Sequence, residues 1–210
     1  MIYLALIGLY LLILDRSAVK LLKQPLVQQL LAATVCILMV LWQLKGQLPG
    51  SPPIHFLGVT CLVLVLGLRL SLLVVPIALF MPMPLLVLLK SQQLTVDQLL
   101  IWQWLCLLFA VIQSYLVLLL SQKWLPRQLF VVIFVGGFFN SILSSISYLI
   151  LMALGFYWFT DTTSFSIDYL MITPLLAFPE GLLNGMTLTM LLVFKPQWLK
   201  YSLWQEQPRR

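Results

Sequence analysis

The chain has 210 residues, of which 62% are hydrophobic and 9% are charged, and its formal net charge is +6. A soluble domain usually carries about 25% charged residues, so this composition cannot cover a water-facing surface and excludes a soluble enzyme. The basic residues lie in short connecting segments and at the tail and form no basic stripe, which argues against a nucleic-acid partner. We expect a single all-α transmembrane domain over residues 1–210, with membrane lipid as its surroundings.

Seven apolar stretches follow one another along the chain: 2–14, 26–44, 54–68, 70–89, 99–120, 129–158 and 169–194. A helix that crosses a bilayer needs about 20 residues, so the first and third stretches are short for a full crossing. Only Arg69 separates the third stretch from the fourth. The alternative to two spans there is one bent element or a re-entrant segment.

The distribution of positive charge favours seven transmembrane helices with the N-terminus outside and the C-terminus inside. One fewer crossing in the first half would scatter the basic residues over both sides, against the positive-inside rule. Lys45 and Lys90 alone remain outside in the favoured topology. The other ten basic residues collect inside: Arg16, Lys20, Lys23, Arg69, Lys123, Arg127, Lys195, Lys200, Arg209 and Arg210.

His55, the only histidine, lies in a Pro- and Gly-rich segment before the third stretch. Imidazole is a common metal ligand, although one His alone makes no metal site, and a hydrogen bond at a helix start is the other interpretation. The fourth stretch contains Pro76, Pro82 and Pro84. Each proline deletes a helical hydrogen bond, and broken helices at membrane depth are tolerated where they line a cavity. This spacing favours a binding pocket or pathway.

The small and polar residues of the sixth stretch have helical spacing. Gly137, Ser141 and Ser145 repeat at i+4, which lets another helix approach closely. That face is a candidate for docking a partner protein, and internal packing is the alternative. Asn140 lies beside it and is a candidate substrate-binding residue.

Glu180 is the strongest functional signal in the sequence, because it places a carboxylate near the middle of the last apolar stretch. A charge at that depth costs roughly 2.5 kcal/mol or more and needs a polar chamber or a partner. Asn184 lies at i+4 and therefore shares its helix face. We predict substrate binding by this pair. The alternative is that Glu180 is protonated, or caps the backbone of another helix, and only holds the bundle together.

The familiar catalytic motifs are missing from the sequence. It has no Walker A sequence, no G-x-S-x-G and no H-E-x-x-H, and no nucleophile, base and orienting residue can be grouped. We therefore predict that the protein is not an enzyme and holds no prosthetic group.

Two patches of sequence resemble the cobalt- and nickel-uptake permeases (CbiM-like) of the energy-coupling-factor ABC transporters. The first is Pro53-Ile54-His55-Phe56-Leu57-Gly58-Val59-Thr60 with Leu66-Gly67 following, which is similar to their S-V-H-L-L-G region. The second is Pro179-Glu180-Gly181-Leu182-Leu183-Asn184-Gly185, which looks like the Gly-Glu-Ala motif of their last helix. Motif identity covers about a tenth of the chain.

The resemblance implies a substrate-capturing permease subunit in the bacterial inner membrane, with about seven helices. Its partners would be a transmembrane coupling subunit and cytoplasmic ATPase subunits, its cargo Co²⁺ or Ni²⁺, and His55 a metal ligand. Metal-binding members begin Met-His, whereas this chain begins Met1-Ile2-Tyr3, and one nitrogen ligand of a square-planar Ni(II) site is therefore missing. The chain carries another substrate, or it uses Glu180 or backbone groups, or it has lost metal transport.

Two other functions stay open at the level of the sequence. One is a permease for another small substrate, such as a vitamin. The other is a non-transporting membrane scaffold, in which Glu180 and Asn184 lock the bundle and the small-residue face holds partner proteins.

Overall fold

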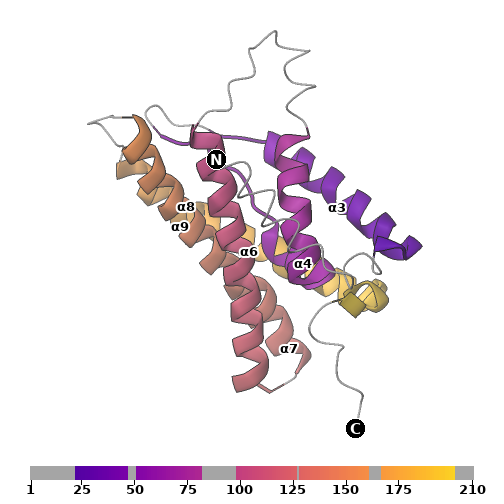
Figure 1. The fold of residues 1–210 in the computed structure, drawn as a ribbon. Coiled ribbons are helices and arrows are strands. Elements are labelled where there is room, and N and C mark those ends of the chain that lie inside the picture. Colours follow the sequence, from indigo (N-terminus) through magenta and orange to yellow (C-terminus); the bar gives the residue numbers. More distant parts are fainter. Residues whose placement is uncertain (1–21, 47–50, 82–97, 127, 161–166, 202–210) are drawn as a thin grey trace.

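The computed structural model describes residues 22–46, 51–81, 98–126, 128–160 and 167–201. Its helical elements are shown in Figure 1: α3 (Pro25–Gln43), α4 (Val59–Phe80), α6 (Gln98–Trp124), α7 (Leu129–Val131), the π-helix η1 (Val132–Phe139), α8 (Asn140–Thr160), α9 (Ile167–Phe194) and the 3-10 helix η2 (Pro196–Tyr201). Within these ranges the structure has no strand, which confirms the all-α prediction.

Five helices in the described part of the chain are long and apolar enough to cross a membrane: Pro25–Gln43, Val59–Phe80, Leu99–Trp124, Leu129–Phe159 and Met171–Phe194. Large apolar side chains are exposed on all five, among them Ile37, Ile77, Phe109, Leu154 and Met186. In water such a surface would drive aggregation, whereas in a bilayer it faces lipid tails. The structure therefore fits a multi-pass membrane bundle. The expected stretch 2–14 lies outside the described residues.

The expected spans 54–68 and 70–89 meet within α4, which consists of two helical parts joined by a sharp kink. The kink lies at Gly67, whose φ of 73° and ψ of 174° are not helical. It brings the Ser71 hydroxyl to 3.2 Å from the Leu62 carbonyl oxygen. Nine residues of straight helix would separate these positions by about 13 Å. Gly67 has this backbone freedom because it has no Cβ.

The chain from His55 to Phe80 enters the bundle and returns to the level at which it entered. His55 bonds Gln103 near the start of α6, and Phe80 packs on Trp104 next to it. Thr60, between these ends, contacts Ser114, which lies about 15 Å further along α6. Residues 51–58 and α4 therefore form one bent unit whose two ends lie at the same level, and we call it the re-entrant unit.

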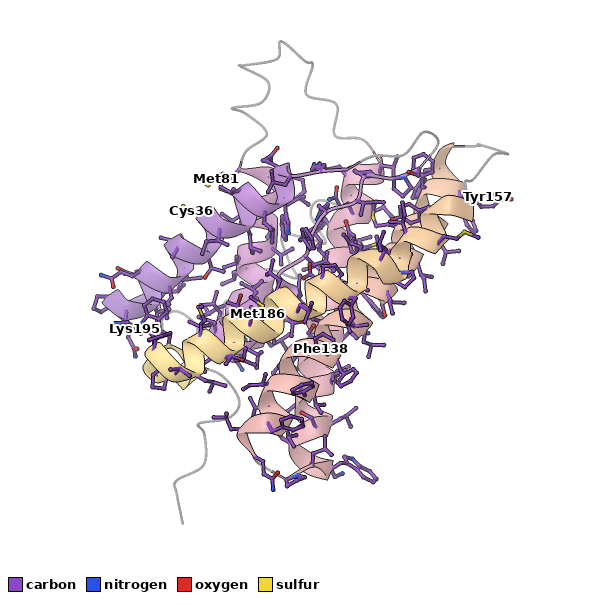
Figure 2. The ribbon with its side chains drawn as sticks, turned by 180° about the vertical axis from the view of Figure 1, so that it is seen from behind. Cys36, Met81, Phe138, Tyr157, Met186 and Lys195 are labelled. Atoms are coloured by element: carbon purple, nitrogen blue, oxygen red, sulfur yellow. The ribbon has the colours of Figure 1, made fainter. Side chains whose placement is uncertain are left out.

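The helix α8 runs antiparallel to both α6 and α9. Trp102 near the start of α6 bonds the Leu151 carbonyl in the second half of α8, and Gly137 of η1, just before α8, lies against Gly185 in the second half of α9. Figure 2 accordingly shows Met81 and Tyr157 toward one edge of the molecule, with Phe138 and Lys195 further from it. The C-terminal ends of α4 and α8, and the N-terminal ends of α6 and α9, lie at that same edge.

Candidate functional site at the start of α4

The segment 51–58 is extended and largely buried, although it belongs to no helix. An antiparallel bridge fixes its middle, since the amides of Gly46 and Ile54 each donate to the other's carbonyl at 2.8 Å. The Trp42 indole N–H donates to the Leu57 carbonyl at 3.1 Å. Irregular backbone at membrane depth must satisfy its polar groups inside the protein. Side chains from α3 and α9 bond the backbone of the segment, and side chains from α6 and α8 bond its His55 ring.

Glu180 of α9 holds the two amides that precede α4. Its Oε2 accepts from the Leu57 amide at 3.0 Å, and its Oε1 accepts from the Gly58 amide at 2.8 Å. Gly58 is the N-cap residue, in the left-handed conformation with φ of 64°, and no local side chain caps the helix. The first amides of a helix have no intrahelical partner. A carboxylate from another helix therefore caps α4.

Asn184 completes this cap one turn later on α9. Its Oδ1 accepts from the Cys61 amide in the first turn of α4 at 3.2 Å, and its Nδ2 donates to Glu180 Oε1 at 2.7 Å. The same Nδ2 donates to the Glu180 carbonyl at 2.9 Å. Glu180 and Asn184 thus form one unit, the α9 clamp, which confirms that the two side chains share a face. The capping alternative for Glu180 is the arrangement observed.

The geometry of the α9 clamp suits an ionised carboxylate. Both oxygens of Glu180 accept from N–H donors, so a carboxyl proton would point at a donor instead of an acceptor. The side chain is 1% exposed, and a buried charge needs a partner. The positive end of the α4 dipole faces it and supplies that partner through backbone N–H groups.

His55 is buried in a second polar group formed with α6 and α8. Its Nδ1 lies 3.1 Å from the Phe56 carbonyl oxygen, which only accepts, so Nδ1 carries a proton. Its Nε2 lies 3.0 Å from both the Gln103 amide nitrogen and the Tyr148 hydroxyl. A neutral ring fits all three contacts, because the single lone pair of Nε2 is then shared by the Gln103 amide and the Tyr148 hydroxyl. Sequence analysis offered two interpretations of His55, a metal ligand and a hydrogen-bonding residue at a helix start, and the structure shows it in hydrogen bonds.

The described residues offer no group of three or more His, Cys, Asp and Glu side chains that could hold a metal ion. In the described arrangement neither ring nitrogen of His55 presents a free lone pair. A metal at Nε2 would require Gln103 and Tyr148 to turn away. The predicted metal role of His55 remains untested by this arrangement of side chains.

The small-residue face, which spans η1 and α8, lies inside the bundle. Gly137, Ser141 and Ser145 are buried, and Gly137 packs on Leu188 and Gly185 of α9. This contact is the internal packing that sequence analysis offered as the alternative to partner docking. Asn140 is also buried, and its Nδ2 donates to the Ser114 and Gly136 carbonyls at 3.1 and 3.4 Å.

An apolar groove runs beside this face, between η1 and α9. Its lining includes Phe134, Phe138, Gly185, Met186, Thr189 and Met190, and Figure 2 shows Phe138 and Met186 close to each other. Glu180 is not among its lining residues. The groove therefore belongs to the lipid-facing exterior and not to the α9 clamp.

Sequence reasoning missed three residues that contact segment 51–58. Trp42 was not assigned to this segment, and Gln103 and Tyr148 were read only as part of apolar stretches. A Gln inside such a stretch was a usable signal, because an intramembrane amide needs a partner. No comparable signal marks Tyr148 or Trp42, since aromatic residues are common in membrane helices.

Comparison with known proteins finds no family model that matches the chain, no similar curated protein and no similar solved structure. The case for a function therefore depends on the residues and their geometry.

Proposed function

We propose that the protein is a substrate-capturing permease subunit that takes up a small solute across a bacterial inner membrane. The observation that supports this proposal is the buried re-entrant unit, in which extended residues 51–58 meet polar side chains from four helices. Broken helices whose ends lie within the membrane are a recurrent way to build solute sites in transporters. An inert bundle has no need of such a segment.

The N-out, C-in orientation belongs to the same proposal. A re-entrant unit replaces two crossings by an entry and a return, so every later loop stays on the side that seven crossings would give it. Lys123 and Lys195 then remain on the inner side with the other basic residues, and the positive-inside rule is satisfied. This orientation exposes the inner ends of α6 and α9 to the coupling and ATPase subunits that the family resemblance implies.

The proposed cargo is a divalent transition metal, cobalt or nickel, or another small substrate such as a vitamin. The metal is supported by the resemblance around His55, and uptake of it would require Nε2 to exchange its two hydrogen-bond donors for the ion. A vitamin would instead use the amide and hydroxyl groups of Gln103 and Tyr148. Uptake assays with each class of cargo distinguish the two.

A matched pair of variants on α6 tests the permease proposal. Gln103→Leu removes the buried bond to His55. Gln113→Leu removes bonds to Ser147 and Leu143 of α8 that are less buried. We expect Gln103→Leu to lower uptake of ⁵⁷Co²⁺ or ⁶³Ni²⁺, or of a labelled vitamin, by tenfold or more (about 1.4 kcal/mol). Gln113→Leu should retain uptake. Equal uptake by both variants and the wild type in cells that express the whole transporter would contradict the proposal.

A second candidate function is a membrane scaffold, favoured by the full engagement of both Glu180 oxygens with backbone and Asn184. On that proposal the α9 clamp serves only the fold, and exposed faces bind partner proteins. A wild-type chain that transports no tested solute, yet copurifies in fixed ratio with a membrane protein that is not an ABC coupling subunit, would support the scaffold.

A further inference from the structure

Four buried polar residues meet where α4, α6 and α8 pack together: Thr60, Ser114, Asn140 and Ser144. The Ser114 hydroxyl lies 3.3 Å from the Thr60 hydroxyl and 2.7 Å from the Ser144 hydroxyl. Each of the four side chains is 0 to 1% exposed. We call them the hydroxyl cluster. It is separate from the α9 clamp and from the His55 group.

The orientation of the Asn140 amide is fixed by its neighbours. Its Nδ2 faces two carbonyl oxygens, those of Ser114 and Gly136, and both only accept. A flipped amide would place oxygen against oxygen. Asn140 Oδ1 therefore points elsewhere, and it has no hydrogen-bond partner in the described structure. A buried acceptor without a donor costs about 1–3 kcal/mol.

The hydroxyls of the cluster have the complementary imbalance. Thr60, Ser114 and Ser144 carry three O–H protons and share two hydrogen bonds, and the part of the chain that the structure describes shows no further acceptor for the third proton. Asn140 and Ser144 lie one turn apart on α8, and both contact Ser114. The unused donor thus lies on one of these three hydroxyls, and the unused acceptor, Asn140 Oδ1, belongs to a side chain that also contacts Ser114.

We propose that the hydroxyl cluster is an internal binding site for a neutral guest of water size, which accepts from a cluster hydroxyl and donates to Asn140 Oδ1. Buried waters typically make about three hydrogen bonds to groups of this kind. A cation satisfies Oδ1 but leaves the third hydroxyl proton without an acceptor. The inference goes beyond the permease proposal, because the site holds its guest whether or not the protein transports a solute.

Water-edited solid-state NMR of the full ¹³C,¹⁵N-labelled protein in liposomes tests this site. Polarisation from water protons should reach the Asn140 side chain several-fold faster than it reaches Ser71. Ser71 is the internal control, because it is equally buried and its hydroxyl already has acceptors in the Leu62 and Gly67 carbonyls. Ser144→Ala should slow the transfer to Asn140 several-fold. This variant removes one hydroxyl without filling the space.

Two results would overturn the proposal. One is wild-type transfer to Asn140 no faster than transfer to Ser71, a comparison that stands even if the Ser144→Ala variant fails to fold. The other is a change in the Asn140 side-chain shifts when choline replaces Na⁺ and K⁺ in the buffer, which would identify a cation as the guest.

Discussion

At the scale of single residues, the carboxylate inside the last helix is engaged with backbone instead of lying free in a cavity. Glu180 and Asn184 together hold the Leu57, Gly58 and Cys61 amides, more than 120 residues earlier in the chain. The i+4 spacing predicted that the two side chains would act on one face. It could not predict their partners, because backbone amides at a helix start leave no mark in the sequence.

The α9 clamp makes a prediction about stability. Asn184→Leu keeps the side-chain volume but leaves the Cys61 amide without its acceptor, at about 1–3 kcal/mol. Glu180→Ala leaves both the Leu57 and Gly58 amides unpaired and should cost more, with Glu180→Gln between the two. Thermal unfolding in detergent by tryptophan fluorescence measures the order.

The control for the α9 clamp is Thr187→Val on the same helix, whose hydroxyl bonds only the Leu183 carbonyl of its own helix and is exposed. It should unfold near the wild-type temperature. Equal unfolding temperatures for Glu180→Ala and Thr187→Val would show that the clamp carries no stability.

At the scale of elements, the course of residues 54–80 was the part of the fold that the sequence left open. The lone Arg69 between two apolar stretches indicated the choice between two spans and one bent element, but hydropathy alone could not decide it. The deciding feature is the backbone of Gly67, whose conformation is not visible in composition. The long helices α6, α8 and α9 were predictable because their apolar stretches exceed about 20 residues.

Gly67→Ala tests the kink of α4. A Cβ at φ of 73° and ψ of 174° is strained, and such residues cost about 1–3 kcal/mol. We expect a lower unfolding temperature for this variant. Gly46→Ala is the matched control, because nothing lies within 4 Å of its new Cβ. The same unfolding temperature for both variants would contradict the kink.

Gly155→Ala tests the packing of α6 against α8. An added Cβ would lie 1.9 Å from the Trp102 indole nitrogen, which donates to the Leu151 carbonyl. The indole must therefore move and lose its hydrogen bond, and overpacking of this kind typically costs about 1–3 kcal/mol. A drop in unfolding temperature together with a shifted Trp emission is expected. A wild-type spectrum would show that the two helices are further apart.

At the scale of the whole molecule, the charge argument assigns the same sides to the later loops whether residues 54–80 cross the membrane twice or form a re-entrant unit. It favoured seven crossings over one bent element on the assumption that the bent element would move later loops across the membrane. The contacts of His55 and Phe80 with neighbouring residues of α6 show that the re-entrant unit enters and leaves at one level. Both paths give the same sides to the later loops.

Cysteine labelling distinguishes a re-entrant unit from a single crossing. In a chain whose native Cys36, Cys61 and Cys106 are serines, Lys45→Cys and Met81→Cys should react with an impermeant maleimide from the same side. Lys195→Cys should react from the opposite side, in inverted vesicles if the C-terminus is inside. Reaction of the Lys45 and Met81 positions from opposite sides would show that α4 crosses the membrane.

The position of the clamp also governs the order in which the protein is built. The start of α4 leaves the ribosome long before the residue that caps it, because Glu180 follows Gly58 by 122 positions. Until α9 is synthesised, amides that a bilayer cannot satisfy remain unpaired. The newly made chain must therefore keep residues 51–80 near water or within the insertion machinery, and the last helix completes their entry.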